Sequence, residues 1–90
     1  MAVTFDGTVR RWREDRPGGL AVVDVPPDLV PELGRRQQRV TGTLNDAPFT
    51  GSTMLVAGGG LCVGVSRAVL DAAHATVRDG VRLSIEPVPR

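Results

Sequence analysis

Apolar and polar residues alternate along several short stretches of this chain, the period-2 pattern of a β-strand with one buried face. The clearest example spans residues 40–56. Residues 40–45 alternate strictly, and a second run of strand-forming residues covers 49–56. Asn45-Asp46 lies between the two runs, and such residues favour tight turns because they hydrogen-bond their own backbone and tolerate positive φ. These residues predict a β-hairpin around which the remaining elements are arranged.

Four further stretches have the length and pattern of strands, namely residues 2–12, 20–25, 61–65 and 81–86. Two short helices are expected between strands. The first lies within residues 26–34, where apolar residues have helical spacing and a glycine can end the helix. The second covers 67–75, and Ser66 is a suitable residue to cap its first turn. The pattern therefore predicts an all-β fold, a small six-stranded barrel with one or two short helices in its connections.

Ninety residues with 41% hydrophobic content are enough for one small domain, which we expect residues 1–90 to form. Because the aromatic content is only 3%, valine, leucine, alanine and isoleucine must build the core. Homodimerisation would add buried area to so small a core. The net charge is +1, and every basic residue is an arginine. This near balance argues against strong non-specific binding to nucleic acid.

Cys62 and His74 are each the single residue of their type, so the chain has no intramolecular disulfide and no structural zinc ligand set. They give no basis for a nucleophile–base pair, because no third orienting residue is evident. No apolar run approaches the roughly 18 residues of a membrane span, and Met1 is followed by a strand pattern rather than a signal peptide. We expect a cytoplasmic protein without a membrane partner, metal or cofactor, and the sequence favours a non-enzymatic role.

A series of segments occurs in a characteristic order: Phe5, Val25-Pro26 with a closing Gly34, residues 40–45 leading into Pro48-Phe49, the glycines 58–60, and residues 65–70 and 79–87. In these segments the chain resembles the DUF1905 family, small bacterial domains of unknown function. The most specific part is Gly-Thr-Leu-Asn followed by Pro-Phe. The resemblance covers nearly the whole chain and implies a small β-barrel of the double-split type, also seen in some transition-state-regulator and antitoxin folds. It implies no activity.

The chain departs from the family pattern at three places. Asn45-Asp46 stands where the turn is usually Asn-Gly, which is conservative turn chemistry. Arg78-Asp79 stands where Gly-Asp is usual before the last strand. Val65-Ser66 replaces a common lysine before the second helix. This last difference removes a cation from the corner where a ligand is most easily placed.

Two groups of residues are candidates for a ligand site. Arg67 follows the cap residue Ser66, and together they could hold a carboxylate or a phosphate. The second group is a polar strip on the hairpin, formed by Thr41, Thr43, Asn45, Ser52 and Met54. If the strip faces a cleft it lines a small-molecule pocket, and if it faces water it is the outer side of a half-buried sheet.

Two other segments have simpler explanations. The glycines at 58–60 could bring backbone N–H groups close to an anion, but they lack the remaining residues of a phosphate loop. Trp12 lies among four arginines within residues 10–16, a pattern that can bind bases and phosphates. Two acidic residues in the same segment largely cancel this charge, which favours a solvated hairpin tip.

Three functions stay open at this point. The sequence favours a non-enzymatic module that binds a protein partner or itself. The first alternative is a barrel that binds a small molecule, or that acts by confinement as a cyclase or isomerase would. The second is a dimeric DNA-binding regulator, suggested by fold analogy and by arginines within 10–16 and 35–39.

Overall fold

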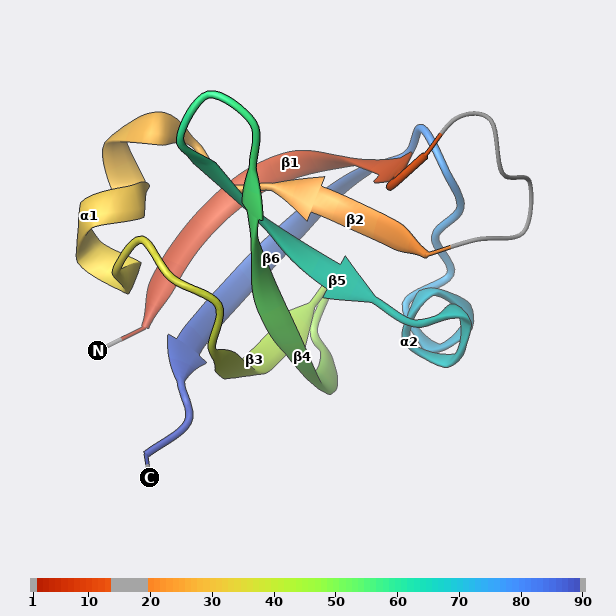
Figure 1. Cartoon of the computed structure of the whole chain (residues 1–90). Coiled ribbons are helices and arrows are strands. Elements are labelled where there is room, and N and C mark those ends of the chain that lie inside the picture. The colour runs from red at the N-terminus through yellow and green to blue at the C-terminus, as the bar shows by residue number, and fades with distance from the viewer. Residues whose placement is uncertain (1, 14–19, 90) are drawn as a thin grey trace.

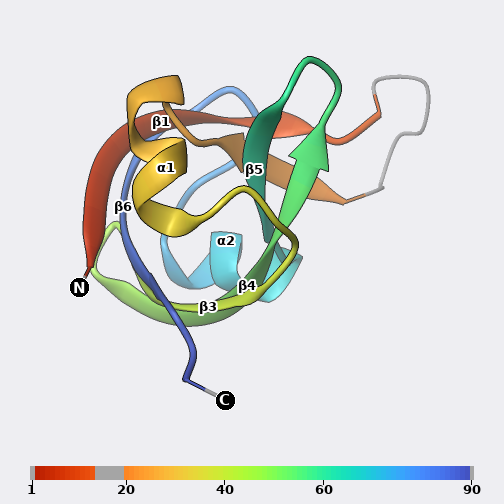
Figure 2. The ribbon, with the colours of Figure 1, turned by 60° about the vertical axis from the view of Figure 1, so that its left-hand side comes forward.

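The computed structural model describes residues 2–13 and 20–89. The strands are β1 (Val3–Arg11), β2 (Ala21–Asp24), β3 (Arg39–Leu44), β4 (Ala47–Val56), β5 (Gly60–Val65) and β6 (Gly80–Pro87). They close into a barrel in the order β1-β2-β5-β4-β3-β6, and every neighbouring pair is antiparallel (Figures 1 and 2). The predicted six-stranded barrel with short helices in its connections is therefore confirmed.

The two longest strands change partner midway, which divides the barrel into two halves. In β1, residues 3–8 pair with β6 and residues 9–11 pair with β2. In β4, residues 47–52 pair with β3 and residues 53–56 pair with β5. Gly51 lies just before the second change, where a Cβ atom would come within 2.7 Å of the carbonyl oxygen of Gly64. The absence of a side chain there allows β4 to bend toward β5.

The predicted hairpin is formed by β3 and β4. Asn45 and Asp46 occupy its two-residue turn with φ of 50° and 69°, the left-handed values that a type I′ turn requires. The Asn45 side-chain oxygen also accepts a hydrogen bond from the backbone N–H of Arg82 at 2.9 Å, which ties the turn to β6. The strand after the turn begins at Ala47, not at residue 49 as predicted. Pro48 fits within it because this part of β4 pairs on one edge, with β3.

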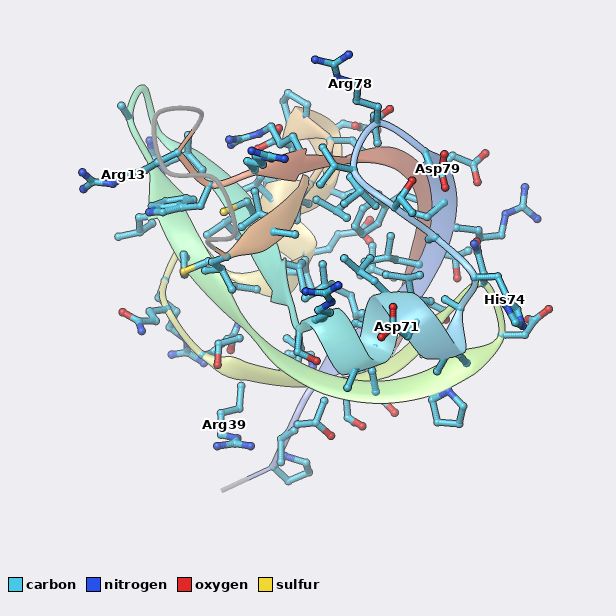
Figure 3. All side chains as sticks on the ribbon, turned by 90° about the vertical axis from the view of Figure 1, so that its right-hand side faces the viewer. Arg13, Arg39, Asp71, His74, Arg78 and Asp79 are labelled. Carbon is cyan, nitrogen blue, oxygen red and sulfur yellow. The ribbon has the colours of Figure 1, made fainter. Side chains whose placement is uncertain are left out.

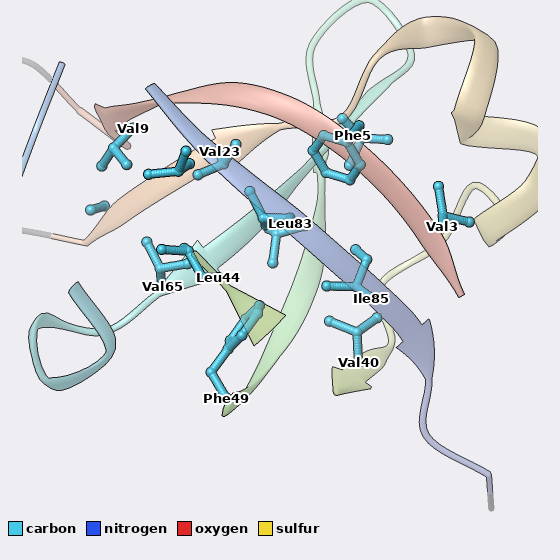
Figure 4. Close-up of a cluster of buried hydrophobic side chains, with 14 of the residues drawn as sticks. Val3, Phe5, Val9, Val23, Val40, Leu44, Phe49, Val65, Leu83 and Ile85 are labelled. Carbon is cyan, nitrogen blue, oxygen red and sulfur yellow. The ribbon is translucent and has the colours of Figure 1, made fainter. Parts of the chain in front are cut away.

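Side chains from all six strands fill the barrel interior (Figure 4). The most deeply buried members are aliphatic, as the composition predicted, and include Val9, Val23, Val40, Leu44, Val63, Leu83 and Ile85. Each of these seven side chains has no exposed surface. These side chains fill the barrel interior and form its hydrophobic core. A ligand site on this barrel therefore has to be sought at its ends or on its outer face.

The helical segments lie at opposite ends of the barrel (Figures 1 and 2). At one end the 3-10 turn η1 (Pro27–Leu29) continues into α1 (Val30–Leu33), which buries Val30 and Leu33 against the core. Gly34 ends this helix with φ of 92°, a value that favours glycine. At the other end lies α2 (Arg67–Ala72), which begins after β5. Both helices were predicted within 26–34 and 67–75.

The second helix is shorter than predicted and ends at Ala72 rather than near Ala75. His74 adopts φ of 56°, and its N–H donates to the carbonyl of Asp71 while the N–H of Ala75 donates to that of Leu70. These two bonds form a Schellman motif, which ends a helix with one left-handed residue. The prediction was wrong here because this position is usually glycine, and histidine gave no stop signal.

Thr53 is a buried polar residue that fastens the segment before β3 onto β4. Its hydroxyl donates to the carbonyl of Arg36 at 2.8 Å and accepts from the N–H of Gln38 at 3.1 Å. The Gln38 side chain in turn donates to the carbonyl of Leu33 at the end of α1. Thr53 therefore links strand β4 to the segment that connects α1 to β3.

Replacing Thr53 with valine keeps the shape but leaves the Arg36 carbonyl and Gln38 N–H without this hydroxyl. We expect the free energy of unfolding to fall by about 1–3 kcal/mol, measured by chemical denaturation. Thr53→Ser retains the hydroxyl and should recover part of the loss. If valine were as stable as threonine while serine were less stable, the methyl group and not the hydrogen bonds would dominate at this position.

Candidate functional site

A half-open cleft of about 620 Å³ lies at the α2 end of the barrel, which we call the mouth cleft. Its apolar lining comes from Leu20, Ala21, Val65, Leu70, Ala75 and Val77. Its polar lining comes from Arg11, Ser66, Arg67, Asp71 and Thr76. These residues lie at or directly beside the ends of β1, β2 and β5, in α2, and in the segment that follows α2. Its size falls within the range of about 300–1,000 Å³ typical of small-molecule sites.

The strand register explains why Arg11 is part of this cleft. Arg11, Ala21 and Val65 are directly opposite one another on β1, β2 and β5, so they share one face. Ala21 and Val65 are buried in the core, and therefore this is the inner face of the barrel. Val9 precedes Arg11 on the same face and is completely buried. The inner row of β1 thus ends in a half-buried arginine at the open end of the barrel.

The segment after α2 is held against the first strand and closes one side of the cleft. The N–H of Arg78 donates to the carbonyl of Val9 at 2.7 Å, and the N–H of Val9 donates to that of Asp79 at 3.0 Å. Asp79 also accepts from the backbone N–H of Thr76 at 2.8 Å. Residues 75–77, which form this wall of the cleft, are therefore held at one end by the bond from Ala75 to Leu70 and at the other by the bonds of Arg78 and Asp79 to Val9.

Two of the five polar side chains of the described lining, Ser66 and Thr76, already form hydrogen bonds within the protein. The Ser66 hydroxyl accepts from the N–H of Val69 at 3.2 Å, and the Thr76 hydroxyl lies 3.3 Å from the Asp79 carboxylate. In the described part of the chain, no hydrogen bond or ion pair engages the guanidinium of Arg11 or of Arg67. These two groups are therefore the charged donors that the described part of the cleft offers to a ligand.

Asp71 is the one acidic side chain of the described lining, and it lies on the exposed side of α2 (Figure 3). His74 lies beyond the end of the helix, and Arg13 and Arg39 lie well away from α2 (Figure 3). Among the described residues, the charged groups that line the cleft are two arginines and one aspartate, which together carry a net charge of +1. An anion is favoured by this balance.

The barrel and its sequence segments agree with one family. The family model described as "Domain of unknown function (DUF1905)" matches residues 5–85, which is nearly the whole chain. The chain belongs to the DUF1905 family. The resemblance noted in the sequence is confirmed by this match, and no match was found among curated proteins.

Ser66 and Arg67, the first pair of predicted site residues, both line the mouth cleft of this DUF1905 domain. Ser66 also caps α2 as predicted. The sequence analysis missed the other side of the cleft, which Arg11 and residues 75–77 form. A signal for Arg11 was present in the alternation of β1, since it occupies an apolar-facing position. No local pattern indicated that residues 75–77 return to β1.

The predicted polar strip lies on the outer face of the barrel, opposite to Val40 and Leu44, and it is divided. Thr43 and Asn45 line a shallow depression of about 390 Å³, together with Thr4, Asp46, Arg82 and Ser84. Ser52 and Met54 lie elsewhere, where the Met54 methyl would be 3.3 Å from a Cβ atom at Gly64. The strip is divided for two reasons. Ser52 is opposite Arg39, at the other end of β3 from Thr43, and Met54 lies beyond residue 52, where β4 pairs with β5.

The outer depression is occupied by an ion pair and by paired hydroxyl groups. Arg82 donates to the Asp6 carboxylate at 2.9 Å, which lowers the pKa of Asp6, and Thr4 donates to Ser84 at 3.2 Å. Both charged side chains are more than two-thirds exposed, so the pair contributes little stability. Because the guanidinium of Arg82 is already paired with Asp6, this depression has fewer charged donors for a ligand than the mouth cleft has.

Two other segments considered in the sequence analysis, the glycines 58–60 and Trp12, make hydrogen bonds within the described part of the fold. The glycine loop 58–60 joins β4 to β5, and Arg35 donates to the carbonyl of Gly59 at 3.0 Å. Trp12 is half-buried and its backbone N–H donates to the carbonyl of Leu20 at 2.8 Å. The arginine-rich tip beyond it lies largely outside the described residues. No described helix is long and apolar enough to cross a membrane, and no metal-ligating cluster occurs among the described residues.

Cys62 has no exposed surface, although it lies on the outer face of β5. It is directly opposite Asp24 on β2 and Met54 on β4. Arg10 makes two hydrogen bonds to the Asp24 carboxylate, at 2.6 and 2.8 Å, beside the thiol. Burial, and secondly the negative charge of Asp24, raise the pKa of Cys62 to about 11. The thiol is therefore protonated and inert at neutral pH.

We expect Cys62 in the folded protein to react with iodoacetamide at pH 8 about 100-fold more slowly than in the unfolded chain. The reason is that both access and the fraction of thiolate are reduced. Mass spectrometry after timed alkylation, with and without guanidinium chloride, measures this ratio. Equal rates under the two conditions would mean that the outer face over β5 is open to solvent.

Proposed function

We propose that this DUF1905 domain is a binding module that takes a small organic molecule in the mouth cleft. The observation that supports this most is the half-open cleft itself. Its floor is formed by the apolar residues Val65, Ala75 and Val77, and the guanidiniums of Arg11 and Arg67 have no partner in the described residues. Ligand sites typically combine such a floor with a few polar groups that fix orientation. The filled barrel interior directs the search to this end of the molecule.

The role we infer is binding without catalysis, by one domain formed by residues 1–90. Cys62, the strongest nucleophile of the chain, is protonated and buried away from solvent. In the described lining, Asp71 is the one carboxylate and has no neighbouring base or acid with which to act as a pair. A small-molecule role therefore ranks above the protein-interaction role that the sequence favoured.

A screen of fragments by two-dimensional NMR tests the proposed function. We expect the bound fragments to shift the amide signals of residues in β2, α2 and the segment 75–77. The exposed Thr76 lines the cleft, so Thr76→Trp should block binding. Thr50→Trp, on the exposed outer face of β4, is the matched control and should bind normally. A screen without binders, or with shifts confined to the outer depression, would contradict the proposal.

Self-association is a second candidate function, favoured by apolar side chains on the surface. Leu20 and Leu55 are 44% and 54% exposed, and Leu20 lies beside Met54 over Gly64. The outer surface that Leu20 and Met54 form can be covered by a second copy of the chain. Sedimentation at micromolar concentration tests this function, and Met54→Glu should shift a dimer to the monomer. A strict monomer over that range would remove the candidate.

A further inference from the structure

We propose that the ligand of the mouth cleft is an amphipathic monocarboxylate, a small molecule with one carboxylate and an apolar body. This inference rests on the proposed function and adds the chemical class of the ligand. The carboxylate would pair with the guanidiniums of Arg11 and Arg67, and the apolar body would lie on the floor of the cleft. Planar guanidinium groups match the geometry of a carboxylate well.

The first argument is the supply of donors. The Thr76 hydroxyl donates to the Asp79 carboxylate and the Ser66 oxygen accepts from Val69, so of these two hydroxyl groups only the single O–H of Ser66 is left to donate to a ligand. The guanidiniums of Arg11 and Arg67 remain, and each has several N–H donors and no acceptor. A ligand group that only accepts hydrogen bonds and carries negative charge satisfies them best.

The second argument is the charge count, which distinguishes a carboxylate from a phosphate. In the described lining, Arg11 and Arg67 contribute two positive charges and Asp71 contributes one negative charge. The resulting +1 matches a monoanion. An alkyl phosphate carries between one and a half and two negative charges near neutral pH, and Asp71 would oppose the second charge.

The third argument is the floor. Val65 and Ala75 are buried, and Val77 is half-buried, so together they form an aliphatic surface without polar side chains. Arg11 lies at the inner edge of this surface, in register with Val65 through the intervening strand. A molecule that is charged throughout would leave the floor uncovered, whereas an amphipathic one covers the floor and reaches the arginines.

The test compares ligands of equal length at pH 8 by isothermal titration calorimetry. The probes are octanoate, 1-octanol, octylammonium and octyl phosphate, with butanoate and hexanoate to vary chain length. We expect octanoate to bind at least about 10-fold more tightly than 1-octanol or octylammonium, because only it pairs with the arginines. Affinity should rise about 2- to 4-fold for each added methylene from butanoate to octanoate, as the floor is covered.

Variants then assign the contacts. Arg11→Gln and Arg67→Gln should each weaken octanoate binding about 10-fold and leave 1-octanol unchanged. Arg13→Gln makes the same change of charge at an exposed arginine that does not line the cleft, and it should alter affinity less than about 2-fold. Asp71→Asn should strengthen octyl phosphate more than octanoate, because it removes the charge that opposes the second negative charge.

Each outcome has a distinct meaning. Equal binding of octanoate, 1-octanol and octylammonium in the cleft would overturn the monocarboxylate assignment and leave the proposed function standing. Tighter binding of octyl phosphate than of octanoate would overturn the choice of carboxylate. An unchanged octanoate affinity in both Arg11→Gln and Arg67→Gln would overturn the assigned contacts. A fragment screen without any binder in the cleft would instead remove the proposed function.

Discussion

Replacing Gly42 with alanine is expected to lower the free energy of unfolding by about 3 kcal/mol or more. Gly42 lies in β3, where a Cβ atom would overlap the main-chain carbonyl of Ser84 on β6. The Cα atom of residue 42 and the Ser84 carbonyl both belong to backbone that is held by the pairing of β3 with β6. They cannot move apart without breaking that pairing. Chemical denaturation measures the loss, and the variant should also give fewer dispersed amide signals by NMR.

Gly80→Ala is the matched control for this substitution. Gly80 is also a strand glycine, at the start of β6, and a Cβ atom there would come no closer than 4.0 Å to the carbonyl oxygen of Gly7. We expect it to be neutral or slightly stabilising, since alanine restricts the unfolded chain. If the two alanine variants were equally stable, the close approach of β3 and β6 at Gly42 would be wrong.

The second large effect is expected for Leu44→Ala, which should cost about 2–5 kcal/mol. Leu44 ends the inner row of β3, has no exposed surface and faces Leu83 in the neighbouring strand. Truncation removes its contacts and leaves a cavity in a core that has few large side chains to close it. Thermal unfolding and chemical denaturation should both report the change.

Leu55→Ala removes the same atoms from the other strand of the β3–β4 connection, in the part of β4 that pairs with β5, and is the natural comparison. Leu55 is 54% exposed near the end of β4, so we expect a change within about 0.5 kcal/mol. The difference between the two leucines measures how far the core extends along β4 toward its end. Similar losses for both variants would mean that Leu55 is covered in solution, which would favour the self-association described above.

Much of the fold could be predicted from sequence because the barrel is built from local patterns. The alternation within residues 40–45 places Val40 and Leu44 inside and Thr43 outside, as the structure confirms. Asn45-Asp46 has the backbone conformation that a two-residue hairpin turn needs. Each of these features depends on neighbours within a few residues, which is the range over which such patterns are informative.

The mouth cleft could be predicted only in part, because tertiary pairing creates it. Ser66 and Arg67 were found through a helix cap, a local signal that the structure confirms. Arg11 enters the same cleft only because β1, β2 and β5 are in register across it. The early end of α2 at His74 also depends on a left-handed histidine, which propensity alone does not indicate.

The division of the polar strip has a similar cause. Thr43 and Met54 follow the same alternation within one predicted hairpin, so the sequence predicted a single surface. β4 changes partner after residue 52, and this separates the outer face next to β6 from the outer face next to β5. A change of partner within one continuous strand leaves its period of two intact, and therefore leaves no mark in the hydrophobic pattern.

The most direct test of the central claim, that this filled barrel binds its ligand at the mouth, is an NMR measurement of contacts between octanoate and the protein's methyl groups. The account predicts nuclear Overhauser effects from the octanoate chain to Val65, Leu70 and Val77. Contacts from octanoate to Val9 or Leu83 would place the ligand inside the barrel. Such contacts, or binding of octanoate without any contact to the three lining residues, would contradict the claim.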